Sequence, residues 1–269
     1  MARGRSGVRG RPGRAARYRR GVTVLWTTAF VDLPAPVHAR GTAFWAAVTG
    51  TSPSAPRGDA DQFATLLPPD GDAFVRVQRL GDAPRVHVDL HVDRLDERTR
   101  QAEALGARVL LREEHTVLAS PGGLVHCLVR DAGERVRPAP VTGSLGGRSR
   151  LDQVCLDVPA GLLDAEVRYW EALTDRPAAC RGEFLVLDRP AGMPLRLMLQ
   201  ELGADDARSH VAAHLDVACG DHVGTVAAQH VALGAEVVDA ERYVWTVMRD
   251  PAGLLYCLTP RDPGTGLTA

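Results

Sequence analysis

Three polar residues that could transfer a proton alternate with apolar residues between positions 86 and 92. In an extended strand the side chains of His87, Asp89 and His91 would all point to one face. Asp89 could orient His91 and make it more basic, as a general base requires. An ordinary hydrogen-bonded strand face explains the pattern equally well. The second half of the sequence keeps two members of this trio, His214 and Asp216.

The cysteines form an odd set without a CxxC pair. They are Cys127, Cys155, Cys180, Cys219 and Cys257. This pattern favours free thiols in a reducing cytosol. Cys127 and Cys257 could act as nucleophiles only if a base or cation lowered the pKa of the thiol. The sequence has no Gly-rich phosphate loop, GxSxG or HExxH motif, which sets those enzyme classes aside.

Positive charge is concentrated at the start of the chain. The formal net charge is -1, and it falls to -9 without the eight arginines of residues 1–20. Residues 1–21 lack the apolar core of a secretory signal. We interpret this leader as a disordered extension rather than an arm that binds nucleic acid or anionic lipid. The remaining chain has no clustered cations, so no nucleic-acid partner is expected.

The composition is that of a soluble globular protein. Hydrophobic residues make up 45% and charged residues 24% of the 269 residues. No apolar run approaches the roughly 18 residues that span a bilayer. We therefore expect a cytoplasmic protein without a membrane partner, either a monomer or a homodimer. The chain has no Lys, Ile or Asn, which indicates the coding bias of a GC-rich genome.

Landmark residues recur in the same order at a nearly constant spacing, which indicates an internal duplication. The spacing grows only from 125 residues (Trp45 to Trp170) to 130 residues (Cys127 to Cys257). We therefore divide the chain into a leader (residues 1–21), module one (22–132), a linker (133–149), module two (150–261) and a tail (262–269). The linker contains Gly, Pro and Arg, as exposed connections often do.

Each module reads as a strand, a helix and several strands, twice over. In module one, short apolar runs bounded by Pro, Gly or Asp predict strands. They cover residues 22–31, 63–67, 74–77, 86–92, 108–111, 116–119 and 124–129. Helices are expected around Trp45 and Trp170, which we assign to the core, and over 95–105, ending at Gly106. Trp26, Tyr243 and Trp245 could instead stack on a planar ligand.

The order of these elements, the module length of about 110 residues and several short motifs resemble the vicinal oxygen chelate superfamily. The motifs are Phe44-Trp45, the His-x-Asp strands, the Leu-Gly-Ala helix stops and the Pro-x-Gly-x-x-x-Cys endings at Cys127 and Cys257. Together they look like the glyoxalase-like subgroup. The resemblance implies an α+β fold of two tandem modules. Each module would be a pair of βαβββ units that form a curled, cup-shaped mixed sheet, with helices on the outer face and ligands inside the cup.

The resemblance also implies positions for metal ligands on the first, fifth and final strands of each module. The matching residues are Thr28, His87 and Cys127 in module one, and Gln153, His214 and Cys257 in module two. The family's final-strand Glu is replaced by Cys, which argues against extradiol dioxygenase and glyoxalase activity. A divalent metal on Gln153, His214 and Cys257 is one hypothesis. A cup that requires no metal is the one we favour at this stage.

Two functions stay open from the sequence. One is a glyoxalase-like lyase or isomerase, and the other is a metal-free protein that binds or sequesters a small, drug-type molecule. The candidate catalytic residues are His214, Cys257, His87 and His91. The candidate ligand-binding residues are Thr28, Gln153, Asp89, Asp216, Cys127 and Trp245. A further hypothesis is that module one serves only as a structural partner of module two.

Overall fold

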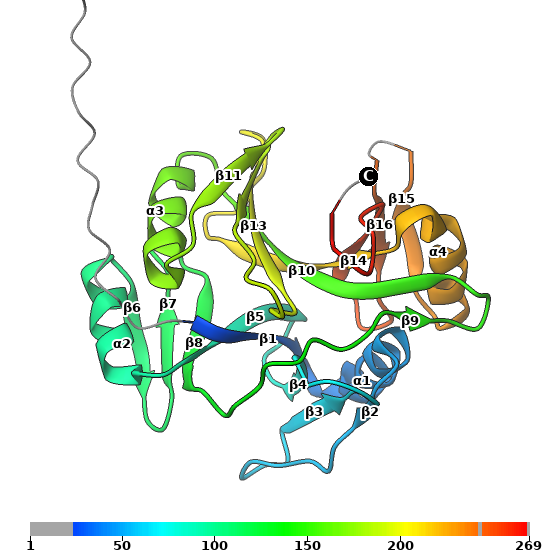
Figure 1. The fold of residues 1–269 in the computed structure, drawn as a ribbon, viewed down its shortest axis with the longest axis horizontal. Coiled ribbons are helices and arrows are strands. Elements are labelled where there is room, and N and C mark those ends of the chain that lie inside the picture. Colours follow the sequence, from blue (N-terminus) through cyan, green and yellow to red (C-terminus); the bar gives the residue numbers. More distant parts are fainter. Residues whose placement is uncertain (1–23, 242–243, 268–269) are drawn as a thin grey trace, which may run out of the picture.

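The protein contains two open sheets, one for each module (Figure 1). The computed structural model describes residues 24–241 and 244–267. The Arg-rich leader and Tyr243 therefore lie outside the described residues. The first sheet has eight strands in the order β2-β3-β4-β1-β5-β8-β7-β6, and the second has nine strands, eight of them in the order β11-β12-β13-β10-β14-β17-β16-β15. The two orders are equivalent, which confirms the tandem α+β architecture.

Each module is built from two successive βαβββ units, as expected. Module one contains β1 (Val24–Leu33), α1 (Ala35–Thr49), β2 (Ser52–Pro53), β3 (Phe63–Leu67), β4 (Val75–Arg79), β5 (Arg85–Val92), α2 (Leu95–Ala104), β6 (Arg108–Arg112), β7 (Thr116–Ala119) and β8 (Val125–Arg130). Module two contains β10 (Arg148–Val158), α3 (Leu163–Thr174), β11 (Ala178–Arg181), β12 (Phe184–Leu187), β13 (Arg196–Glu201), β14 (Ala212–Ala218), the 3-10 helix η1 (Gly220–His222), α4 (Val223–Ala232), β15 (Glu236–Asp239), β16 (Thr246–Arg249) and β17 (Leu255–Thr259).

The segment between the modules contributes one short strand. β9 (Val141–Thr142) pairs antiparallel with the beginning of β10, so this part of the connection is tied to the second sheet. A glycine follows each of the two helices of module one. Gly50 has φ 62 at the end of α1 and Gly106 has φ 98 just after α2, a backbone conformation that glycine adopts without strain.

The first helix of each module packs against the other module. In Figure 1, α1 lies beside α4, and α3 lies beside α2. Phe44 on α1 is in edge contact with His230 on α4, with ring centroids 5.7 Å apart. Arg98 on α2 donates a hydrogen bond to the carbonyl oxygen of Leu173 on α3. Each of the two helix pairs, α1 with α4 and α2 with α3, therefore contains one helix from each module.

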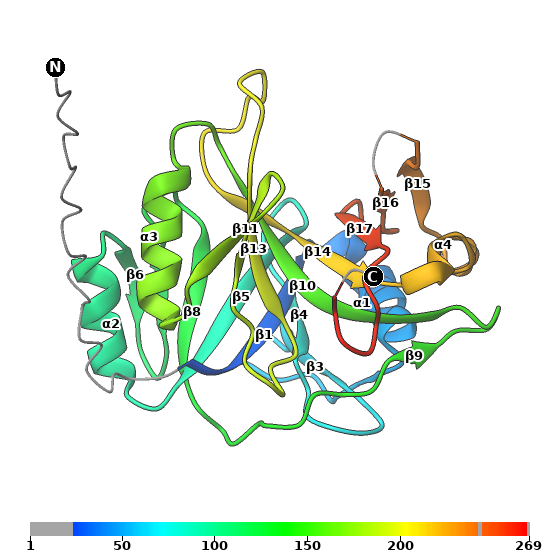
Figure 2. The ribbon, with the colours of Figure 1, turned by 45° about the horizontal axis from the view of Figure 1, so that its top comes forward.

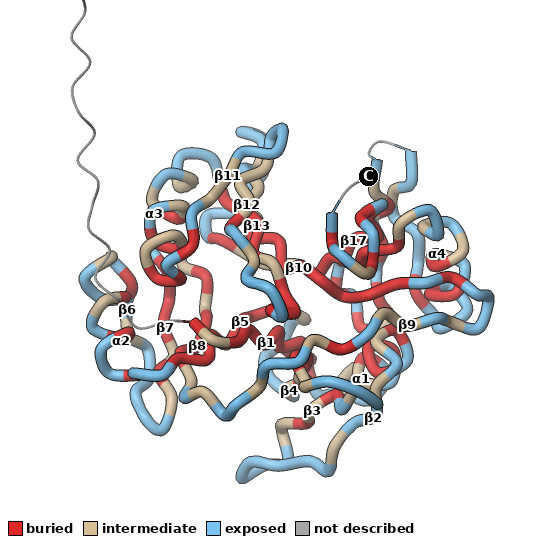
Figure 3. Tube along the Cα trace, in the orientation of Figure 1, coloured by how far each residue is buried: buried red, intermediate tan, exposed pale blue. Residues whose placement is uncertain are grey.

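The core is continuous through both modules. One cluster of buried apolar residues includes strand residues of β1, β5, β8, β10, β14 and β17 together with residues of all four α-helices. Figure 3 shows these central strands as the buried parts of the trace. Trp45 and Trp170 are both fully buried in this core, as the apolar helix pattern predicted. Figure 2 shows how the strands curve away from the centre, leaving a concave face that we call the cup of each module.

Candidate functional site

The cup of module two opens into a cavity of about 1000 Å³. Alternate residues of β13, β14 and β17 line it, together with Asp157 of β10, because side chains of a strand alternate between its two faces. The register places Cys155 opposite His214 and Gln153 opposite Asp216 on the paired strands β10 and β14. Polar groups from four strands therefore meet on the floor of one cavity.

His214, Asp216 and Cys257 form a compact cluster at this floor. One ligand atom from each of the three side chains lies within 4.8 Å of the others. The Nε2 atom of His214 is 3.3 Å from Oδ1 of Asp216. On the other side of the ring, Nδ1 of His214 lies 3.2 Å from Oδ2 of Asp157, at the end of β10. Asp157 thus orients the imidazole so that Nε2 faces Asp216 and Cys257.

Gln153 does not offer its amide oxygen to this cluster. Its side-chain nitrogen donates a hydrogen bond to Asp216. Its oxygen accepts a 2.6 Å hydrogen bond from Nε of Arg196, which lies on the neighbouring strand β13. We therefore assign Gln153 the role of holding Asp216 and Arg196, rather than the ligand role that the resemblance implied.

Burial and neighbouring charges shift the pKa values of the cluster residues. Burial lowers the pKa of His214, but Cys155 and the carboxylates of Asp157 and Asp216 raise it by more, so the pKa lies well above its ordinary value. Burial raises the pKa of the Cys257 thiol. Arg261, from the segment after β17, lies 3.6 Å from Asp216. The surrounding acidic groups therefore favour a positive charge at the position of His214.

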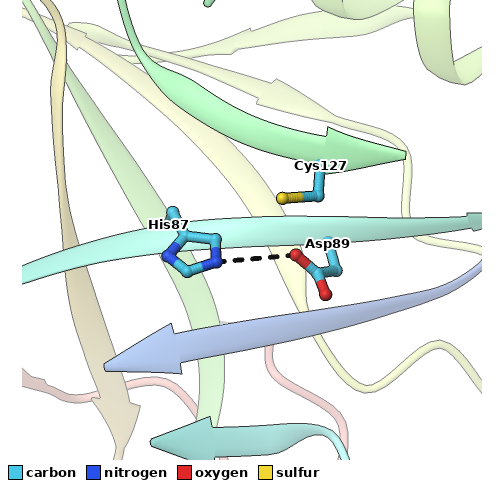
Figure 4. A group of neighbouring side chains, drawn as sticks. All are labelled: His87, Asp89 and Cys127. Carbon is cyan, nitrogen blue, oxygen red and sulfur yellow. Dashed lines mark ion pairs between the residues drawn. The ribbon is translucent and has the colours of Figure 1, made fainter. Parts of the chain in front are cut away.

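Module one repeats the cluster with His87, Asp89 and Cys127 (Figure 4). Nδ1 of His87 lies 2.9 Å from Oδ2 of Asp32, at the position equivalent to Asp157, and Nε2 lies 3.6 Å from Oδ1 of Asp89. Burial, followed by the charge of Asp89, raises the pKa of the Cys127 thiol far above its ordinary value. The same carboxylate-histidine-carboxylate arrangement was thus produced in both modules.

In the cup of module one, an aromatic side chain lies against the histidine of the cluster. The ring of Phe30 stacks on His87 with centroids 4.6 Å apart and an interplanar angle of 11°. The guanidinium of Arg76 lies over the ring of Phe30, 5.7 Å from its centroid. His87, Asp89 and Cys127 are all buried. None of these three residues lines the cavity of about 1000 Å³ that the module-two cluster lines.

His91 is oriented by different partners from the one expected. Its Nε2 atom is 2.9 Å from the Thr28 hydroxyl, and its Nδ1 atom is 3.3 Å from a carboxylate oxygen of Glu134 in the linker. Asp89 instead lies nearest His87. Burial, only partly opposed by the charge of Glu134, lowers the pKa of His91. The shared face of His87, Asp89 and His91 is as expected, but the carboxylate beside His91 comes from outside the strand.

The donor sets of both clusters fit a divalent metal ion. In each, one buried carboxylate oxygen, Oδ1 of Asp89 or of Asp216, accepts no hydrogen bond from the described residues. Metal-bound histidines usually donate their other ring N–H to a carboxylate, and Asp32 and Asp157 are placed to accept that bond. Ligand atoms about 2 Å from a common ion lie about 3 to 3.5 Å apart, close to the measured His–Asp distances. Of the two clusters, only that of module two lines the 1000 Å³ cavity.

Asp216 supplies the carboxylate that the final strand lacks. The resemblance implied the first-strand Gln153, the fifth-strand His214 and the final-strand Cys257 as ligands, and Asp216 was expected only among the residues that bind the organic ligand. The signal was present in the sequence, because Asp216 lies two residues after His214 and shares its strand face. Sequence reasoning missed Asp157, Arg196 and Arg261 altogether, since their relation to the cluster depends on pairing between distant strands.

The tryptophans divide between core and cavity. Trp26 is 1% exposed and its indole N–H donates to the carbonyl oxygen of Ala73, so it belongs to the core. Trp245 lines the cavity of module two and meets Phe184 edge to face at 5.7 Å. Thr28 and Cys127, in contrast, belong to module one and do not line this cavity. Of the two sets of sequence-derived candidates, those of module two are the ones brought together at a cavity.

Among the described residues, no helix is both long enough and apolar enough to cross a membrane. This agrees with the absence of a long apolar run in the sequence.

Comparisons with known structures agree with this architecture. A 4-hydroxymandelate synthase variant from Streptomyces coelicolor is 17% identical, with a TM-score of 0.60, and the match covers 91% of this chain and 95% of that one. A 2,2',3-trihydroxybiphenyl 1,2-dioxygenase from Sphingomonas wittichii is 16% identical, with a TM-score of 0.59 and coverages of 88% and 90%. A homoprotocatechuate 2,3-dioxygenase variant from Brevibacterium fuscum is 13% identical, with a TM-score of 0.61 and coverages of 91% and 73%. At these identities, the likeness shows the shared fold.

No curated protein matched the sequence. The sequence model of the glyoxalase-like domain, however, matches two segments, residues 28–129 and 153–259. Each segment runs from the ligand position on the first strand of a module to the end of its last strand, and together they cover most of the chain. The protein is therefore a member of the glyoxalase-like domain family, with two tandem domains of the vicinal oxygen chelate fold.

Proposed function

We propose that the protein binds a small organic molecule in the cup of module two and acts on it as a lyase or isomerase. In this proposal, a divalent metal is held by His214, Asp216 and Cys257. The observation that carries the proposal is that these three side chains converge at the floor of a cavity of about 1000 Å³. Pockets that bind small molecules commonly have volumes in this range.

The metal, when bound, would supply a Lewis acid that polarises an oxygen atom of the bound molecule. The chain's own residues prepare the site for this role. Asp157 fixes the ring of His214, and Gln153 fixes the carboxylate of Asp216. Both carboxylates also line the cavity, where they are the acidic groups nearest to His214. We assign proton transfer at the bound molecule to this pair.

The two modules divide the work unequally in this proposal. Module two has the open cavity, whereas Phe30 covers His87 in module one. Module one still covers the outer face of the second sheet through α1, because Phe44 contacts both His230 and Tyr256. We therefore assign module one a supporting role in folding and place the chemistry in module two.

Metal analysis of the purified full-length chain tests this proposal. We expect a stoichiometric divalent metal that is lost in His214→Ala and retained in His222→Ala, a control that changes an exposed histidine away from the cluster. Retention of the metal in His214→Ala and its loss in His87→Ala would place the metal in module one and refute the assignment. Metal-free protein that still binds organic compounds would refute the catalytic proposal and favour sequestration.

The substrate is approached by a thermal-shift screen of small organic compounds with and without added divalent ions. A compound that binds only the folded state raises the melting temperature in proportion to its occupancy. We expect the strongest shifts to require both the compound and the ion. Shifts that are identical in wild type and in His214→Ala would contradict a role for this cluster in binding.

A further inference from the structure

One partly buried arginine in the cup of module two has no carboxylate partner. Arg196 on β13 lines the cavity, and its only hydrogen bond within the described part of the chain runs from Nε to the amide oxygen of Gln153. No carboxylate of residues 24–241 or 244–267 makes an ion pair with it. Its two terminal nitrogens, Nη1 and Nη2, carry four further N–H donors in a planar fork. A partly buried guanidinium normally pairs with an anion.

Of the other three arginines that line the cavity, two are paired with carboxylates and the third, Arg181, is exposed. Arg261 binds Asp152 and lies near Asp216. Arg208, at the rim, pairs with Asp157 and Asp206. Both of these arginines therefore have carboxylates within ion-pairing distance, which Arg196 does not.

The electrostatic surroundings of Arg196 also favour an added negative charge. Burial, and then the positive charge of Arg261, lower the pKa of the Arg196 guanidinium to about 10, although the carboxylates of Asp152 and Asp216 act in the opposite direction. An anion beside Arg196 would offset both effects, because it would replace lost hydration and screen the repulsion between the two cations.

The rest of the cavity wall suits a flat, apolar group. Phe184 and Trp245 meet edge to face with ring centroids 5.7 Å apart, and both line the cavity. Met198, two residues after Arg196 on the same face of β13, is uncharged and 9% exposed. Aromatic and thioether side chains provide favourable contacts for planar apolar groups.

We propose that the ligand of module two is a small aromatic monocarboxylate, whose carboxylate pairs with Arg196 and whose ring packs against Phe184, Trp245 and Met198. This inference rests on the proposed function, because it specifies the class of molecule that the cup takes. A guanidinium fork matches a carboxylate through two parallel hydrogen bonds. Asp157 and Asp216 line the same cavity and would repel a phosphate dianion more strongly than a monoanion.

The test uses three pairs of compounds and two matched variants of the full chain. Benzoate, phenylacetate and 3-phenylpropionate are each compared with their primary amides by calorimetric titration, with phenyl phosphate as an additional probe. Arg196→Met removes the charge but keeps a side chain of similar length. Arg181→Met is the control, because Arg181 lines the same cavity but is exposed. Arg196→Lys keeps the charge but removes the fork.

We expect at least one acid to bind wild type about tenfold to a hundredfold more tightly than its amide, the range for a hydrogen bond to a charged group. Arg196→Met should abolish this preference, Arg196→Lys should restore it in part, and Arg181→Met should leave it intact. Melting temperatures of the variants establish that they fold.

Other outcomes overturn the inference in distinguishable ways. Acids and amides that bind equally well, with no effect of Arg196→Met, would leave small-molecule binding in the cup intact and refute the carboxylate assignment. Loss of the preference in Arg181→Met alone would move the anion to the rim. If phenyl phosphate binds more tightly than every acid, the assignment of the ligand as a monocarboxylate is refuted. If neither acids nor amides bind, the inference and the proposed aromatic cup fail together.

Discussion

Trp45 and Asp250 are joined by a 2.8 Å hydrogen bond from the indole nitrogen to a carboxylate oxygen across 205 residues of sequence. Trp45 lies on α1 of module one, and Asp250 lies in the turn that precedes β17 of module two. Asp250 also accepts hydrogen bonds from the backbone nitrogens of Ala252 and Leu254, each at 2.8 Å. A single buried carboxylate thus fixes both the shape of the turn and the position of a helix from the other module.

The equivalent contact on the other side of the molecule has its parts exchanged. Trp170 on α3 donates a 2.8 Å hydrogen bond to Glu166 on the same helix, and Glu166 accepts the backbone N–H of Gly122 in the turn before β8. Here the carboxylate lies on the helix and the glycine in the turn. In the first contact the carboxylate lies in the turn and Gly41 on the helix, against Ala252. In each contact, the element that carries the carboxylate therefore packs against an element that carries a glycine.

Replacing Trp45 by Phe should destabilise the protein by about 1–3 kcal/mol, because it leaves a buried oxygen of Asp250 without its donor. Chemical denaturation measures this loss. Trp26→Phe is the matched control, since its indole donates to a neutral carbonyl oxygen at 3.2 Å, and we expect a smaller effect there. Equal losses in the two variants would show that the carboxylate acceptor has no special role.

Gly122→Ala should destabilise the fold by about 1–3 kcal/mol through overpacking. A Cβ atom there would lie 2.6 Å from Cγ2 of Val211 and 2.9 Å from Oε1 of Glu166. The equivalent residue of module two is already alanine, so Ala252→Gly provides the control and should change the unfolding free energy much less. Denaturation of both variants decides the point, and a neutral Gly122→Ala would show that the turn relaxes freely.

Asp157→Asn should weaken metal binding by about tenfold to a hundredfold, the usual cost of losing a carboxylate that orients a metal-bound histidine. This prediction depends on the proposed metal site. Asp206→Asn is the control, because it removes a negative charge from the same arginine, Arg208, without contacting His214. Competition with a chromogenic chelator measures the affinity. Equal weakening in both variants would indicate a general charge effect and contradict orientation of His214.

Acidification should destabilise the protein through His230. Burial lowers the pKa of this side chain from 6.5 to about 4, so the folded state holds fewer protons than the unfolded state between these values. The stability contribution is therefore complete above pH 6.5 and is lost as the pH falls towards 4. The loss from this residue should reach about 2 kcal/mol at pH 5.

Comparison of His230→Gln with wild type isolates this contribution. Glutamine keeps a polar group near the Tyr256 hydroxyl, which lies 2.9 Å from Nδ1 of His230, but it does not titrate. We expect the difference in unfolding free energy between pH 7.5 and pH 5 to be smaller in the variant than in wild type. A pH dependence that is the same in both proteins would mean that His230 takes up no proton on unfolding.

Local patterns in the sequence predicted much of the fold and part of the site. Strand alternation placed His87, Asp89 and His91 on one face, and the repeated landmarks predicted two equivalent sheets. These features are local or depend on duplication, so they can be predicted from the sequence alone. The partners of His91 could not be predicted in this way, because Thr28 and Glu134, which contact its ring, come from other segments of the chain.

The amino-acid sequence alone determined that one α+β module was made twice and that its histidines face equivalent cups, because strand and helix periodicity is encoded residue by residue. Tertiary structure alone decided which atoms meet. The pairing of β10 with β13 and β14 brings Gln153 to Arg196 and Asp216, and packing places the ring of Phe30 on His87 in module one, whereas His214 of module two lines a large cavity. Such contacts join strands that are distant in sequence, so their distances are set by register and packing rather than by any local pattern.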